Sequence, residues 1–152
     1  MYLTVHGAAA LFIARAIPNP FVSFGVGLAS HFIIDLVPHG DEHIIPSHLT
    51  RPKKIRRLMG AALLDGIILA GFLILYLWLN PTLSLNTVLA CLVGSLLPDF
   101  LQGLYFVTEA GWLKMLNKFH IKIHNLPGSK LNWRLGMLIQ VLTFMAFWLL
   151  II

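Results

Sequence analysis

Charged side chains are scarce in this chain. Asp, Glu, Lys and Arg make up 11% of its 152 residues, whereas 58% are hydrophobic. A soluble domain of this length carries about 25% charged and about 45–50% apolar residues, and a small soluble fold cannot hide this much apolar surface. The composition therefore excludes an ordinary soluble domain. It predicts an all-α, polytopic membrane bundle of about five hydrophobic helices, with residues 1–152 forming a single membrane-embedded domain.

Cysteine is almost absent, and so are several well-known catalytic motifs. The single Cys91 permits no intrachain disulfide and no cysteine-type zinc site. The sequence contains no G-x-S-x-G nucleophile elbow, no P-loop, no Gly-rich nucleotide loop and no H-E-x-x-H pair. The first seven residues include no Lys or Arg, so we expect no cleaved signal peptide.

Basic residues are concentrated in two segments, residues 51–57 and 114–134. A net charge of +5 could suggest a nucleic-acid partner. Concentration in two loops is instead typical of residues that determine membrane topology. We therefore expect membrane lipid as a partner and no nucleic acid.

Hydropathy and the positions of Pro and Gly indicate five apolar segments, at about residues 3–17, 21–37, 58–79, 87–107 and 131–152. About 20 residues are needed to cross a bilayer, so the first two segments are short. We interpret them as a tightly packed hairpin, with a re-entrant pair as the alternative.

The charge distribution also predicts an orientation. If the N-terminus is cytoplasmic, ten of the eleven Lys and Arg residues lie inside and only Arg15 lies outside. This places the chain in a bacterial or archaeal plasma (inner) membrane with its N-terminus in the cytoplasm. The ionisable residues of the apolar segments then fall in the inner half of the membrane, which predicts a single site there.

The strongest candidate ligands are His31, Asp35 and His39. An ionisable side chain at membrane depth costs about 2.5–3.5 kcal/mol on insertion scales. His31 and Asp35 are spaced i, i+4 and share a helix face, and His39 follows beyond Pro38. Imidazole and carboxylate together are ligands of zinc, manganese and non-haem iron. Asp35 could instead orient a liganding histidine, or a His–Asp hydrogen bond could simply join helices.

Three further residues are candidates for the same site. His6 precedes a run of small residues that permits close helix approach, so it is either a metal ligand or an interfacial residue. Asp99 follows Pro98, where proline within a span frees a backbone carbonyl, so Asp99 is a metal ligand, a general base, or a partner for Ser or Thr. Asp65 is a candidate catalytic residue, because a buried Asp stays charged only beside a metal or histidine.

His120 and His124 are also spaced i, i+4, within an amphipathic stretch. This stretch either covers the site as a lid or lies along the lipid headgroups. Weaker ligand candidates are found in the loop after the second segment: Asp41, His43 and His48.

Two short motifs resemble a known family. The runs GLASHFIIDLVPH at residues 27–39 and GSLLPD at residues 94–99 are similar to motifs of the LexA-regulated, membrane-bound, predicted metal-dependent hydrolases (YdjM-like). The resemblance implies a membrane-embedded metal-dependent hydrolase, and it is carried by His6, His31, Asp35, Pro98 and Asp99.

The leading functional hypothesis is an inner-membrane metal-dependent hydrolase that acts on a lipid-linked or phosphorylated substrate. A divalent ion, zinc by ligand type, would lower the pKa of a bound water toward about 7, with Asp99 or Asp65 in catalysis. The predicted metal ligands are a subset of His6, His31, Asp35, His39 and Asp99. The alternatives are a small metal or proton transporter and a non-catalytic membrane subunit. No oligomeric state is predicted.

Overall fold

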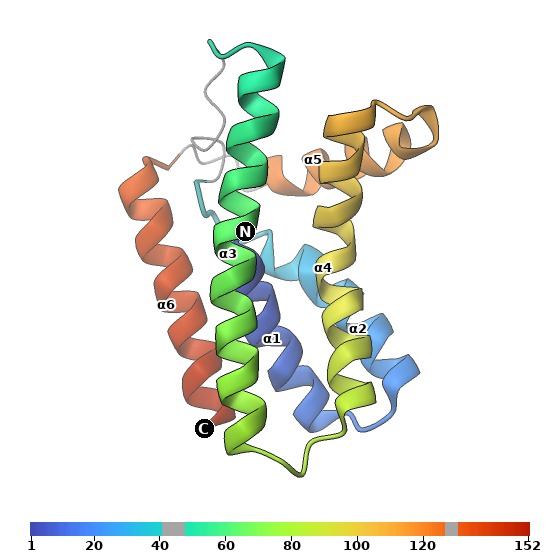
Figure 1. Cartoon of the computed structure of the whole chain (residues 1–152), viewed down its shortest axis with the longest axis vertical. Helices are drawn as coiled ribbons and strands as arrows, with labels where there is room; N and C mark the ends of the chain where they lie inside the picture. Colours follow the sequence, from blue (N-terminus) through green and yellow to red (C-terminus); the bar gives the residue numbers. More distant parts are fainter. Residues whose placement is uncertain (41–47, 127–130) are drawn as a thin grey trace.

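The structure, a computed structural model, describes residues 1–40, 48–126 and 131–152, and all regular elements in these ranges are helical. The α-helices are α1 (Leu3–Ala16), α2 (Pro20–Ile34), α3 (Arg51–Leu79), α4 (Leu85–Thr108), α5 (Lys114–Asn125) and α6 (Trp133–Ile151), with a short 3-10 turn, η2 (Gly111–Leu113), before α5 (Figure 1). The all-α prediction is confirmed for the described residues. The count differs from five, because the amphipathic stretch that contains His120 and His124 is itself a helix.

Three helices, α3, α4 and α6, are long and apolar enough to cross a membrane. Much of their apolar surface faces outward: the side chain of Trp78 on α3 is 76% exposed and that of Leu149 on α6 is 70% exposed. Apolar surface exposed on this scale is typical of contact with lipid. At about 1.5 Å per residue, α1 and α2 are only about 21 and 22 Å long, shorter than the hydrocarbon core of about 30 Å.

Helix α1 is the centre of the bundle, and it contacts α2, α3, α4 and α6. Its residues from Val5 to Leu11 are all buried. The small side chains at residues 7–10 allow neighbouring helices to approach closely, as the sequence indicates. Because His6 lies at the start of this buried run, its ring is enclosed by the bundle.

The closest helix crossing joins α2 to α4, and two glycines make it possible. A Cβ atom at Gly27 would lie 2.6 Å from the backbone carbonyl oxygen of Cys91, and one at Gly94 would overlap the backbone of Phe24. About one turn beyond these glycines, α2 carries His31 and α4 carries Asp99. The crossing therefore brings the two predicted motifs together.

We predict that Gly94→Ala destabilises the protein by about 1–3 kcal/mol, because the added methyl must push α2 away from α4. Gly103→Ala on the same helix is the matched control, since nothing lies within 4 Å of the added Cβ, and there alanine should stabilise the helix by up to about 1 kcal/mol. Thermal unfolding in detergent measures both. Equal unfolding temperatures for the two variants would contradict the tight crossing.

Candidate metal centre

The carboxylate of Asp35 lies at the centre of a histidine cluster. Asp35 directly follows the last residue of α2, and its side chain is fully buried. Its Oδ1 atom is 3.2 Å from Nε2 of His6. Its Oδ2 atom is 3.0 Å from Nε2 of His31, 3.2 Å from Nε2 of His120 and 3.0 Å from Nε2 of His124. Imidazoles from α1, α2 and α5 thus converge on a single carboxylate.

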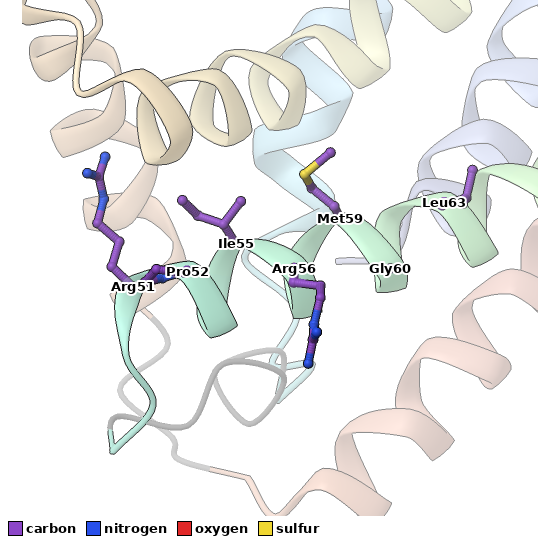
Figure 2. A pocket seen from close by; sticks show the side chains of 7 residues that line it. All are labelled: Arg51, Pro52, Ile55, Arg56, Met59, Gly60 and Leu63. Carbon is purple, nitrogen blue, oxygen red and sulfur yellow. The ribbon is translucent and has the colours of Figure 1, made fainter.

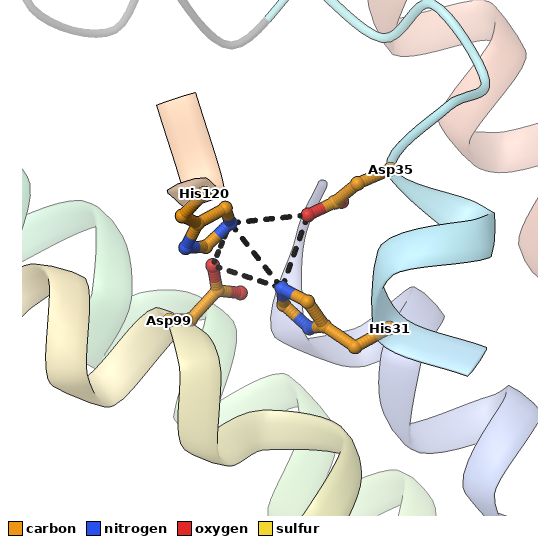
Figure 3. Close-up of side chains that lie close together, drawn as sticks. All are labelled: His31, Asp35, Asp99 and His120. Atoms are coloured by element: carbon orange, nitrogen blue, oxygen red, sulfur yellow. Dashed lines mark hydrogen bonds and ion pairs between the residues drawn. The ribbon is translucent and has the colours of Figure 1, made fainter. Parts of the chain in front are cut away.

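The carboxylate of Asp99, on α4, faces the same cluster from the opposite side. Its Oδ1 atom is 3.8 Å from Nε2 of His31 and 3.6 Å from Nε2 of His120, and its Oδ2 atom is 3.9 Å from Nε2 of His6. These distances are too long for hydrogen bonds. Figure 3 shows the four side chains pointing toward one another, and their ligand atoms all lie within 4.8 Å: His31, Asp35, Asp99 and His120.

The distances between the imidazole nitrogens fit a bound cation. The Nε2 atom of His120 lies 3.3 Å from Nε2 of His31. In a tetrahedral zinc site with Zn–N bonds of about 2.0–2.1 Å, neighbouring ligand nitrogens are about 3.3 Å apart. The cluster is therefore already close to the spacing that a shared cation imposes.

Hydrogen bonding around His31 supports the same conclusion. Its Nδ1 atom lies 2.8 Å from the carbonyl oxygen of Ser95, to which it donates, so in the neutral ring Nε2 carries a lone pair directed into the cluster. In that tautomer Nε2 of His31 and Oδ2 of Asp35, which are 3.0 Å apart, both present lone pairs, and a shared cation would satisfy both atoms. Nδ1 of His6 and Nδ1 of His120 are buried without a hydrogen-bond partner among the described residues, and Nε2 of His6 contacts Oδ1 of Asp35 at 3.2 Å.

Predicted ligand His39 lies beside this group. Asp35, His39 and His124 form a second set whose ligand atoms lie within 4.8 Å of one another. The rings of His39 and His124 have centroids 4.9 Å apart. Asp35 therefore belongs to both sets.

Predicted catalytic residue Asp65 belongs to neither set. Its carboxylate accepts hydrogen bonds from the backbone N–H groups of Leu3 and Thr4 and from the Thr4 hydroxyl. These N–H groups belong to the first turn of α1, where no residue of the same helix can pair with them. Asp65 thus caps α1 from α3, and a negative charge there also complements the helix dipole.

The ligand set expected from the sequence omitted His120 and His124. Their i, i+4 spacing on an amphipathic helix was the available signal, and the structure turns both rings toward Asp35. Of the weaker candidates, Asp41 and His43 lie outside the described residues, and His48 is exposed and belongs to neither set.

Comparisons with protein-family models, with curated proteins and with solved structures gave no match. The class of this protein is therefore defined by its own fold and site: an all-helical protein with three helices able to span a membrane and a buried His/Asp cluster able to hold a metal ion.

We predict that Asp65→Ala lowers stability and leaves metal binding intact. Losing the cap of α1 should cost about 0.5–2 kcal/mol, while the two ligand sets keep all their members. Thermal unfolding and the metal content of the purified variant check this prediction. Loss of bound metal with unchanged stability would instead place Asp65 in the site.

Proposed function

We propose that this protein is an integral-membrane, metal-dependent hydrolase whose divalent cation is held by His31, Asp35 and His120, with Asp99 facing it. The observation that carries the proposal is the convergence of these four side chains, from α2, α4 and α5, on one point. Mixed imidazole and carboxylate ligands favour zinc. Three protein ligands also match catalytic zinc sites, which keep one position open, whereas structural sites are closed.

A cation bound there would supply Lewis acidity to polarise the substrate and to activate water. The burial of the two carboxylates in the site indicates a different role for each. Asp35 is fully buried and contacts several imidazoles, which suits a ligand. Asp99 is 19% exposed and lies 3.6 Å or more from the Nε2 atoms of His6, His31 and His120, so it is accessible and not hydrogen-bonded to these rings, which suits a general base. The carbonyl of Ser95 orients His31.

The lining of a cavity on α3 favours the proposal of an amphiphilic substrate with an anionic headgroup. This cavity, of about 710 Å³, is lined by Arg51, Pro52, Ile55, Arg56, Met59, Gly60 and Leu63. Figure 2 shows Arg51, Ile55 and Met59 pointing to the same side of α3. A guanidinium group at one end suits a phosphate, and the apolar side chains along the next turns suit a lipid chain. We therefore propose a lipid-linked or phosphorylated substrate, whose anionic group would compete with Glu109 for Arg51.

The membrane side is part of the same proposal. The ten-to-one distribution of Lys and Arg favours a cytoplasmic N-terminus in a bacterial or archaeal plasma membrane. The substrate would then reach the site from the cytoplasmic leaflet. The similarity of residues 27–39 and 94–99 to the YdjM-like hydrolases supports the same type of reaction.

The test is hydrolysis of lipid-linked phosphate esters by the detergent-purified protein, with elemental analysis of each sample. A chelator should abolish hydrolysis, and added Zn²⁺ should restore it. Asp99→Asn should lower kcat by about 10²–10⁴-fold, the range of a general base, and retain metal. His31→Ala should lose metal as well as activity.

The exposed His48 provides the matched control, because His48→Ala removes an imidazole that belongs to neither ligand set. Hydrolysis that persists in His31→Ala would overturn the proposal. Metal transport into vesicles without hydrolysis would point to a transporter, and variants that lose only stability would point to a non-catalytic subunit.

A further inference from the structure

We infer that the cluster holds two divalent cations that share the carboxylate of Asp35. The second cation would bind Asp35, His39 and His124, whose ligand atoms converge within 4.8 Å. This inference rests on the proposed function and deepens it, because it sets the number of cations and the chemical class of the substrate.

The two oxygens of Asp35 and the arrangement of α5 make a shared ligand possible. His120 and His124 lie one turn apart on α5, and each places Nε2 within 3.2 Å of Oδ2 of Asp35. His120 belongs to the first set and His124 to the second, and their Nε2 atoms are only 2.9 Å apart. The two sets are therefore adjacent. Paired catalytic cations lie about 3.5–4 Å apart, a separation that a bridging carboxylate can span.

His39 is held in a conformation that suits a ligand. Its Nδ1 atom lies 2.7 Å from the carbonyl oxygen of Val37, to which it donates, so the lone pair of the neutral ring is on Nε2, which lies 3.1 Å from the nitrogen of Met1. The side chain of Gln140 on α6 donates to the His39 carbonyl at 3.0 Å, and a Cβ at Gly136 would overlap that same carbonyl. Two contacts from α6 thus fix the backbone of this turn.

The space between Asp35 and His39 holds the nitrogen of Met1, which the second cation would displace. The nitrogen of Met1 lies 2.9 Å from Oδ1 of Asp35 and 3.1 Å from Nε2 of His39. A carboxylate and an imidazole lone pair that converge on one N–H group present the same field to a cation. The side chain of His124 is 23% exposed, which gives this half of the cluster access to the exterior.

A pair of cations favours a phosphate ester, one of the substrate classes that two-metal sites hydrolyse. A pair at this separation stabilises both the attacking and the leaving oxygen of an in-line displacement at phosphorus.

The experiment is a count of metal ions per chain. The full-length protein in detergent is saturated with Zn²⁺, freed of excess ion and measured by elemental analysis. We expect two equivalents for the unaltered chain, one for His39→Ala, one for His124→Ala and two for the control His48→Ala. We expect none for Asp35→Asn. Circular dichroism and gel filtration confirm that each variant is folded.

A second measurement needs no variant. With Mn²⁺ in place of Zn²⁺, two ions at the expected separation give a spin-coupled electron paramagnetic resonance spectrum, and His39→Ala should convert it to that of a single ion. One equivalent in the unaltered chain, unchanged in His39→Ala, would overturn the second cation and leave the proposed function standing. No bound metal at all would overturn both.

Discussion

The structure depends on one buried carboxylate. Asp35 has no access to solvent, and four imidazole nitrogens approach within 3.2 Å of its two oxygens. An isolated ionised carboxylate in a low-dielectric interior is costly unless it is paired or coordinates a metal. Because the imidazoles come from α1, α2 and α5, the same contacts that stabilise the charge also determine how these helices pack. The same set of interactions therefore forms the site and holds this end of the bundle together.

The rest of the bundle supplies what this carboxylate requires. Helix α1 is rich in small residues and can lie between α2, α3, α4 and α6, which buries His6. The glycines at the crossing of α2 and α4 bring His31 close enough to bond to the Ser95 carbonyl. Asp65 completes the first turn of α1, directly before His6. The two buried aspartates thus have different roles. Asp35 contacts the histidines of the cluster, and Asp65 caps α1, the helix that carries His6.

Much of the fold could be predicted from the sequence, because hydropathy and proline positions reflect local constraints. The five apolar segments correspond to α1, α2, α3, α4 and α6. The i, i+4 spacing placed His31 and Asp35 on one face, and the Pro98-Asp99 motif identified the facing carboxylate. The contribution of α5 could not be predicted in this way. The amphipathic pattern of this segment predicts a lid over the site and a helix along the lipid headgroups equally well. Only tertiary packing turns His120 inward. For Asp65, the sequence predicts burial but not the hydrogen-bond partners. Its bonds to the start of α1 depend on where a helix distant in sequence begins.

Helix α5 is subject to two constraints that act on opposite faces. Its inner face carries the histidines, and His120 is almost fully buried. Its outer face exposes Met115 and Phe119, with Trp112 in the preceding turn and lysines in the same segment. That pattern of apolar and cationic side chains favours the boundary between headgroups and acyl chains. The site thus lies under the inner face of α5, whose histidines contact Asp35. This arrangement meets two requirements at once: α5 covers the buried carboxylate of Asp35, and the partly exposed side chain of His124 leaves one side of the cluster open.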